Sequence, residues 1–294
     1  MTTDPTTPLV FAHRGSSASL PEHTLDAYRQ AIDEGADGLE CDVRLTRDGH
    51  LVCIHDGRLD RTSNGRGRVS AATLDQLERL DFGRRLAIAP RPGGVKDFDE
   101  VTGSDGVKGP DGATFPNGAD DTEDAKDSAV GVLTLERLVT TALDANRPLR
   151  LLIETKHPSR FGSAVEVRLV DLLARYGLDV ANAQSPVAVT VMSFSPLALR
   201  TVRDLAPTLP RVFLFELALP RVLDGRPPFA APIIGPGVAT LREHPDLVRR
   251  AHERGRQVYV WTVNEPDEVD LVLDLGVDGI ISDRPAYVLS RLGR

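Results

Sequence analysis

Short apolar runs alternate with helical segments along nearly the whole chain, and this alternation constrains the fold more than any other feature. Helical spacing of apolar residues, with Thr, Ser or Pro near the start of several segments, predicts helices at 24–34, 73–80, 135–145, 163–176, 196–205, 245–254 and 266–275. Compact apolar runs predict buried strands at 8–12, 38–43, 51–55, 149–154, 187–192, 211–215, 232–234, 258–262 and 279–281. Strands that alternate with helices are typical of a parallel sheet with helices packed on it.

Nine strands are predicted, one more than the eight that a closed parallel barrel needs. Too few residues separate strand 38–43 from strand 51–55 for a parallel crossover, which takes a dozen or more. Asp48-Gly49 lies between them, and Asp-Gly is a strong hairpin turn signal. We therefore interpret 51–55 as an antiparallel return strand. The other eight strands predict an α/β fold, a (β/α)8 TIM barrel with an extra hairpin strand after its second strand.

The hairpin also predicts which residues face each other. If Asp48 and Gly49 are the two turn residues, Asp42 lies directly opposite His55 and shares its face of the sheet. In the same register Cys53 faces Arg44, whereas Cys41 points to the other side, so a disulfide between the two cysteines is not expected. A slip of one residue in the register would change both expectations.

Residues 93–131 form an acidic, glycine-rich segment, which holds ten Asp or Glu residues against three lysines. Most of the net charge of −8 therefore lies in this part of the chain. We expect a largely irregular insertion within a single catalytic domain that spans 1–294. It is either a tolerated surface loop or a lid over the substrate.

The overall composition limits which classes of partner and which cellular location are expected. There is no positively charged and apolar N-terminal leader, and no run of about 20 apolar residues that could span a membrane. Two cysteines in 294 residues give no disulfide framework, so a cytoplasmic protein without integral membrane association is expected. The negative net charge, without a block of Lys and Arg, argues against nucleic acid as a partner. Nothing in the sequence indicates the oligomeric state.

Carboxylates gather where the barrel strands end, which is where barrel enzymes have their active sites. Glu40 and Asp42 end the second strand on one face, and Glu154 ends the third. Three oxygen ligands suit Ca²⁺ or Mg²⁺ better than zinc, which favours His and Cys. We therefore expect one divalent cation, Ca²⁺ or Mg²⁺, on these three residues.

Basic and aromatic residues follow the same strand ends. Arg14 and Lys156 are placed to hold phosphate oxygens. His13 and His55 titrate near neutral pH and can divide the work of general base and general acid. Trp261 is either the wall of an alcohol pocket or a core tryptophan at a strand end.

In this order the motifs resemble those of the glycerophosphodiester phosphodiesterase family. They are His13-Arg14-Gly15, Glu40-x-Asp42, His55-Asp56 and Glu154-x-Lys156, followed by VMSFSP, VYVWTVNEP and GVDGIISDRP. The resemblance covers nearly the whole chain outside the acidic segment. Any one of these motifs alone would be weak, but the combination is specific.

The resemblance implies a metal-dependent hydrolase that cleaves glycerophosphodiesters into sn-glycerol 3-phosphate and an alcohol. It implies that His13 and His55 are the acid/base pair, that Glu40, Asp42 and Glu154 bind the metal ion, and that Arg14 and Lys156 contact phosphate. Glu22 is retained from the family pattern and is a further candidate at the substrate. The headgroup, the physiological cation, the order of the two histidines and the nucleophile, water or a glycerol hydroxyl, stay open.

One departure from the family pattern and two rival functions remain. The family usually has Asn where this chain has His23, so altered local hydrogen bonding is expected there. A related barrel phosphodiesterase that acts on lysophospholipids or sphingolipids is the first rival, although 5% aromatic residues and an acidic insertion suit an anionic membrane poorly. A binding protein on an inactive barrel is the second, but it predicts missing site residues, and none is missing.

Overall fold

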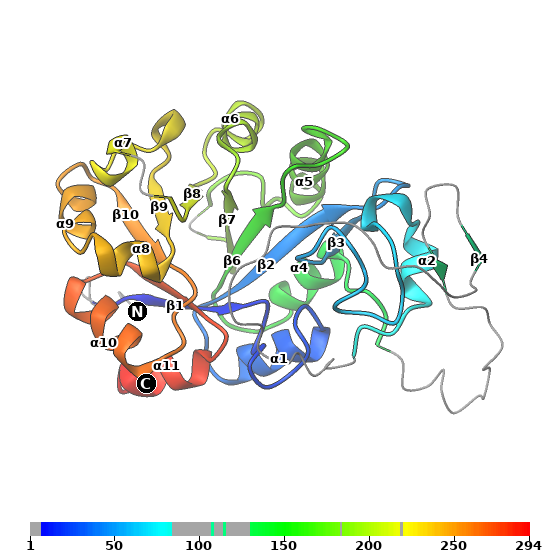
Figure 1. Ribbon diagram of the computed structural model, residues 1–294, viewed down its shortest axis with the longest axis horizontal. Coiled ribbons are helices and arrows are strands. Elements are labelled where there is room, and N and C mark those ends of the chain that lie inside the picture. The colour runs from blue at the N-terminus through cyan, green and yellow to red at the C-terminus, as the bar shows by residue number, and fades with distance from the viewer. Residues whose placement is uncertain (1–6, 84–106, 109–113, 116–129, 183, 218–219) are drawn as a thin grey trace.

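The computed structural model describes residues 7–83, 107–108, 114–115, 130–182, 184–217 and 220–294. Eight parallel strands form a closed ring at its centre (Figure 1). In ring order they are β1 (Leu9–His13), β2 (Gly38–Leu45), β6 (Leu149–Thr155), β7 (Val187–Ser193), β8 (Arg211–Phe215), β9 (Ile233–Pro236), β10 (Gln257–Val260) and β11 (Gly279–Ser282). β1 pairs with both β2 and β11, which closes the ring and confirms the predicted (β/α)8 barrel.

Helices surround the ring (Figure 1). They are α1 (Leu25–Asp33), α2 (Leu74–Glu78), α4 (Leu135–Leu143), α5 (Ala164–Arg175), α6 (Pro196–Leu205), α7 (Pro220–Leu223), α8 (Val238–Glu243), α9 (Leu247–His252), α10 (Pro266–Leu275) and α11 (Pro285–Arg291). Thr24, Thr73, Thr134 and Ser195 cap four of them by accepting a hydrogen bond from a backbone N–H of the first turn. All seven predicted helices are confirmed: those at 196–205 and 266–275 have the predicted bounds, and the other five have shifted ends. The short helices α7, α8 and α11, of four to seven residues, were not predicted.

Apolar side chains fill the interior of the barrel. Phe11, Leu152, Met192, Val212, Leu214, Ile233, Tyr259 and Ile281 form one buried cluster there. Strand residues of the opposite parity pack outward against the helices in two larger clusters. Because the barrel is a packed core, its charged groups collect at the carboxyl ends of the strands.

The extra hairpin strand exists, but the predicted register is wrong by one residue. β3 (Leu51–Cys53) is antiparallel to β2, and Val43 faces Cys53. The loop has three residues, Arg47, Asp48 and Gly49, because Thr46 pairs with His50 and Gly49 takes a positive φ of 87°. Asp42 is therefore not opposite His55: its carbonyl oxygen accepts from the backbone N–H of Ile54. β3 also ends two residues earlier than predicted.

The same slip changes the faces of the cysteines. Cys53 faces Val43 instead of Arg44, so it lies on the same side of β2 as Cys41. Both thiols are buried in one apolar cluster and neither forms a disulfide. The expectation that no disulfide joins them agrees with the structure, but the predicted opposite faces were wrong.

The acidic segment 93–131 lies outside the described residues, apart from four residues of a short antiparallel pair and residues 130–131. The pair consists of β4 (Val107–Lys108) and β5 (Thr114–Phe115). The predictions about an insertion and a lid are therefore untested. In the part of the chain that the structure describes, no helix is long and apolar enough to cross a membrane.

Candidate functional site

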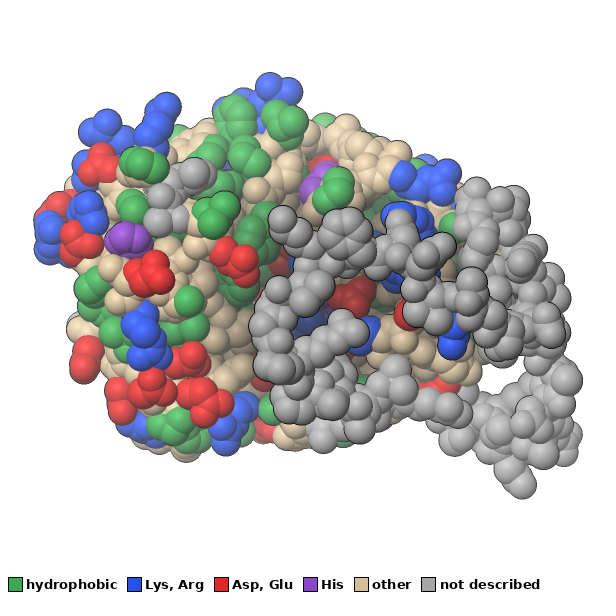
Figure 2. All heavy atoms as spheres, in the orientation of Figure 1, with side chains coloured by type: hydrophobic (Ala, Val, Ile, Leu, Met, Phe, Trp, Pro, Cys, Tyr) green, Lys and Arg blue, Asp and Glu red, His purple; other side chains and the backbone are tan. Residues whose placement is uncertain are grey.

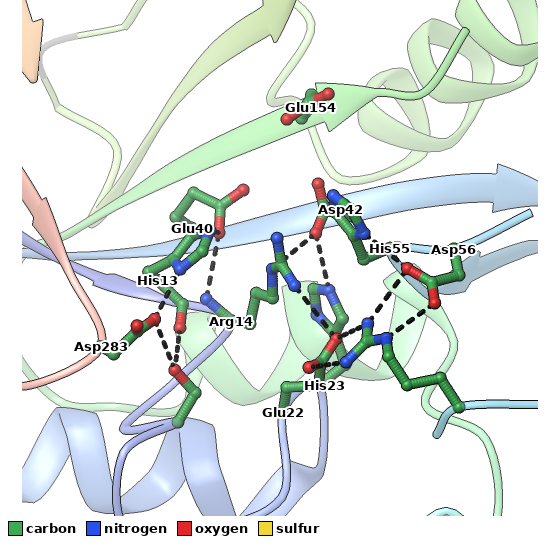
Figure 3. Close-up of polar contacts among 12 residues, drawn as sticks. His13, Arg14, Glu22, His23, Glu40, Asp42, His55, Asp56, Glu154 and Asp283 are labelled. Carbon is green, nitrogen blue, oxygen red and sulfur yellow. Dashed lines mark hydrogen bonds and ion pairs between the residues drawn. The ribbon is translucent and has the colours of Figure 1, made fainter. Parts of the chain in front are cut away.

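Three carboxylates converge at the ends of β2 and β6 (Figure 3). Asp42 on β2 lies beside Glu154 on β6 in the parallel register, and Glu40 shares the face of Asp42. One oxygen from each of the three lies within 4.8 Å of the others, and all three residues are buried. This arrangement could hold a metal ion, as the sequence predicts. Figure 2 shows acidic and basic side chains together at the centre of this face of the molecule.

Burial and mutual repulsion perturb the three carboxylates. Burial and then the charge of Asp42 raise the pKa of Glu154 to about 7, against the opposing charge of Lys156. The same two effects raise the pKa of Glu40 well above its usual value. Burial also acts to raise the pKa of Asp42, but the hydrogen bond from His23 and the charges of Lys156 and Arg14 hold it well below its ordinary range. A divalent cation would remove the repulsion and favour ionisation of all three.

Two cations approach Asp42 from different elements. Lys156 Nζ lies 3.2 Å from Asp42 Oδ1 and 2.7 Å from Glu154 Oε1. Arg14 Nε lies 3.1 Å from Asp42 Oδ2, and the backbone N–H of Arg14 donates to Glu40 Oε2 at 3.0 Å. Arg14 can turn back in this way because the turn after β1 runs against α1. Gly15 is required there, since a Cβ would lie 2.7 Å from the backbone carbon of Ala27.

His13 is oriented by a carboxylate at the opposite end of the sequence. Its Nδ1–H donates to Asp283 Oδ1 at 2.6 Å, which leaves Nε2 toward Glu40, 4.0 Å from Oε2 (Figure 3). Ser17 donates to Asp283 Oδ1 and Asn264 donates to Asp283 Oδ2. Burial acts to raise the pKa of Asp283, but these hydrogen bonds, that from His13 first, lower it to about 2. Asp283 therefore stays ionised and keeps one tautomer of the ring.

His55 is held in the same manner by its neighbour in sequence. Its Nδ1–H donates to Asp56 Oδ1 at 2.7 Å, and Arg61 Nε donates to Asp56 Oδ2 at 2.7 Å. Burial lowers the pKa of His55, although the bond to Asp56 and the charge of Asp42 oppose this. His55 thus lies within the field of the carboxylate cluster even though it is not opposite Asp42. Two His–Asp pairs therefore flank the three carboxylates.

Glu22 pairs with cations instead of facing the carboxylates. It accepts from two nitrogens of Arg61, at 2.6 and 2.7 Å, and from Arg14 Nη1 at 3.2 Å. Burial acts to raise the pKa of Glu22, but Arg61 and Arg14 lower it to about 2. Glu22 thus links Arg14 to Arg61, the residue that donates a hydrogen bond to Asp56.

His23 fills the position where the sequence departs from the family pattern. It adopts a positive φ of 59° and is buried. Its Nε2–H donates to Asp42 Oδ2 at 3.0 Å, and Nδ1 lies 2.8 Å from Tyr28 Oη, which in turn donates to the carbonyl oxygen of Glu40. Burial lowers the pKa of His23. These hydrogen bonds link the start of α1 to the carboxylate of Asp42 and to the backbone of Glu40.

Trp261 follows β10 on the far side of the barrel mouth. Its Nε1–H donates to the carbonyl oxygen of Gly235, and its ring meets the edge of Phe194 with 5.3 Å between centroids. The ring is half-buried and packs against the interior cluster of the barrel. Phe194 lies between Trp261 and Lys156, whose Nζ is 6.0 Å from the Phe194 ring centre. Both sequence interpretations of Trp261 remain compatible with this position.

The roles of several residues of the site could not be predicted from the sequence. Asp283 and Asn264 follow barrel strands, but only the closed ring brings them to His13. Asp56 adjoins His55 in the quoted motif, and this adjacency was the available signal for its role. No sequence pattern indicated a role for Arg61, because single arginines are common in polar loops.

The fold and the site together define a TIM-barrel protein with an acidic cluster that could hold a cation and two His–Asp pairs beside it. The profile of the glycerophosphoryl diester phosphodiesterase family matches residues 13–287. The chain belongs to this family.

Individual relatives match over nearly their full length. Probable glycerophosphodiester phosphodiesterase 1 of Mycobacterium tuberculosis is 43% identical, with 95% of this chain and 90% of the relative covered. A glycerophosphodiester phosphodiesterase of Caldanaerobacter subterraneus is 29% identical, with 96% of each covered. Among solved structures, an Oleispira antarctica phosphodiesterase in complex with the product sn-glycerol 3-phosphate has a TM-score of 0.71 at 20% identity, with 98% of this chain and 97% of that one covered. A glycerophosphodiester phosphodiesterase from Parabacteroides distasonis has a TM-score of 0.70 at 21% identity, with 97% of each covered.

Replacing Glu22 with glutamine is expected to destabilise the protein in a pH-dependent way. The pKa of Glu22 is about 2 in the folded state against an ordinary 4.5. The ionised group therefore contributes on the order of 3 kcal/mol above pH 4.5, and this contribution is lost as the pH falls toward 2. Urea unfolding at pH 7 and pH 3 measures it. A difference between wild type and Glu22→Gln that did not shrink at pH 3 would contradict the assignment.

Proposed function

We propose that this chain hydrolyses glycerophosphodiesters to sn-glycerol 3-phosphate and an alcohol, in one catalytic domain and with one Ca²⁺ or Mg²⁺ on Glu40, Asp42 and Glu154. The observation that carries the proposal is the pair of histidines, each oriented by an aspartate, on either side of a buried carboxylate cluster. Membership of the family and the activity for which its relatives are named support the substrate class.

The donor set fits a hard divalent cation. All three donors are carboxylate oxygens. Asp42 Oδ1 is buried and lacks an aligned hydrogen bond among the described residues, with only the ion pair to Lys156 near it. When bound, the cation would polarise the phosphoryl oxygens.

The protein's own groups supply orientation and proton transfer. Arg14 and Lys156 bind the phosphate and balance its charge, and Glu22 positions Arg14. With Nδ1 of each ring committed to an aspartate, Nε2 of His13 and of His55 is the atom that exchanges protons with the substrate. One imidazole takes the proton of the nucleophile, and the other donates a proton to the leaving alcohol. Trp261 lies where it could bound the alcohol or glycerol pocket.

The purified protein is expected to release sn-glycerol 3-phosphate from glycerophosphocholine. A coupled glycerol 3-phosphate dehydrogenase assay measures it, with lysophosphatidylcholine as the rival substrate. EDTA should abolish activity, and Ca²⁺ or Mg²⁺ added in excess should restore it. Activity that persists in EDTA would refute the metal assignment. Release of a product from lysophosphatidylcholine alone would favour the lysophospholipase interpretation.

A further inference from the structure

A cavity adjoins the site beyond the carboxyl ends of β2 and β6. It has a volume of about 410 Å³ and opens beside Lys156. Four of its lining residues are cationic, and none of the described residues that line it is acidic; the cations are Arg44, Arg68, Arg160 and Lys156. This volume is in the range of small-ligand pockets. A polar cavity with this charge, in contact with a phosphate-binding lysine, suits an anion.

Strand alternation explains why the cations lie just beyond the carboxylates. Arg44 follows Asp42 by two residues on β2, and Lys156 follows Glu154 by two at the end of β6. The mouth of the barrel therefore has a layer of carboxylates and then, further out, a layer of cations. A substrate phosphate at the carboxylate cluster would have the cationic cavity as its immediate neighbour.

Arg44 is fixed in place by hydrogen bonds to the backbone. Its Nε and Nη2 both donate to the carbonyl oxygen of His55, at 2.9 and 2.7 Å. An anion in the cavity would offset the cost of burying this guanidinium.

Arg160 joins the two walls of the cavity. Its Nη1 donates to the carbonyl oxygen of Ser70 at 3.5 Å, and its guanidinium lies 5.5 Å from the ring centre of Phe161. Ser70 belongs to the short helix after β3, whereas Phe161 precedes α5. Arg68 and Ser70 come from the first wall and Arg160 and Phe161 from the second, so the cavity is built from segments that the barrel brings together.

We infer that this cavity binds a second phosphate on the alcohol half of the substrate, so that glycerophosphodiesters of phosphorylated polyols are preferred. The inference rests on the proposed function and extends it to a substrate class. Several arginines suit a phosphate monoester, because their planar forks bind its oxygens in pairs. A cationic alcohol such as choline would meet the like charges of Arg44 and Arg68, with no carboxylate among the described residues that line the cavity.

Glycerophosphoinositol 4-phosphate and glycerophosphoinositol form the decisive pair of substrates, because they differ by one phosphate on the alcohol. We expect kcat/KM to be at least tenfold higher for the 4-phosphate, mainly through a lower KM, and the ratio to fall as ionic strength rises. A ratio of one or less at low salt would overturn the inference. If glycerophosphocholine is hydrolysed but neither inositol substrate is, the inference fails and the proposed function stands. If no glycerophosphodiester is hydrolysed with metal supplied, the proposed function itself fails.

Variants test whether the cavity causes the preference. The double variant Arg68→Gln/Arg160→Gln is expected to reduce the ratio of the two kcat/KM values at least fivefold. Arg79→Gln is the matched control, since Arg79 is an exposed arginine paired with Asp75 on α2, and it should leave the ratio unchanged. Circular dichroism checks that the variants fold. An unchanged ratio in the folded double variant would overturn the inference, and Arg160→Glu provides an independent variant whose expected loss is larger.

Discussion

Replacing His13 with alanine is expected to lower kcat by about 100- to 10,000-fold, because the ring is one of two proposed proton-transfer groups. KM should change little, since Arg14 and Lys156, the proposed phosphate-binding residues, are unaltered in this variant. Steady-state kinetics on glycerophosphocholine with saturating cation measure both values. His13 lies at the mouth of the barrel with Nε2 directed toward Glu40, so the loss is not expected to come from misfolding (Figure 3).

Two further variants separate chemistry from a general effect of losing an imidazole. His252→Ala removes an exposed histidine paired with Asp278 on the outer ring and should retain wild-type kcat. Asp283→Asn keeps the ring of His13 but removes the charge that orients it, so kcat should fall about 10- to 100-fold. Wild-type turnover in His13→Ala would refute the acid/base assignment.

Replacing Asp42 with asparagine is expected to have two effects: it should abolish cation binding, and it should destabilise the fold. Asp42 is the buried counterion of Lys156 and Arg14 and accepts a hydrogen bond from His23. Removing one partner from such a set leaves uncompensated buried charge and costs about 3–5 kcal/mol. The loss of repulsion on Glu40 and Glu154 offsets part of this cost, because both can then ionise more easily.

Calorimetric titration with Ca²⁺ and urea unfolding measure the two effects of Asp42→Asn separately. Asp267→Asn is the control, since Asp267 is an exposed partner of Arg242 on the surface. A variant that bound Ca²⁺ with wild-type affinity would exclude Asp42 as a ligand. A variant with wild-type stability would show that Lys156 and Arg14 do not depend on this carboxylate.

The barrel could be predicted from the sequence because its strands are continuous apolar runs separated by capped helices. Thr24 and Thr134, for example, start helices by the same hydrogen bond that the sequence pattern implies. The hairpin register could not be fixed, since Asp48-Gly49 suits both a two-residue turn and a three-residue loop. Only Gly49 at positive φ, with the Thr46–His50 pair, selects the second. A shift of one residue reversed the side to which Cys53 points.

The proximity of the candidate site residues was predictable in part. Glu40, Asp42 and Glu154 come together as expected, because parallel strand ends meet at one edge. The partner of His13 was not identified, since no local pattern relates residue 13 to residue 283. His23 was noticed only as a departure from a motif, and its contacts with Asp42 and Tyr28 depend on the packing of α1.

The bond between His13 and Asp283 joins the first strand of the barrel to the residue after the last. During synthesis the chain would therefore pass through a long period in which its carboxylates and both histidines have been made but His13 has no orienting partner. β11 closes the ring, and Asp283 directly after it completes the active arrangement. Activity would thus report on whether the ring has closed. A nascent or truncated chain that lacks Asp283 would be a poor catalyst.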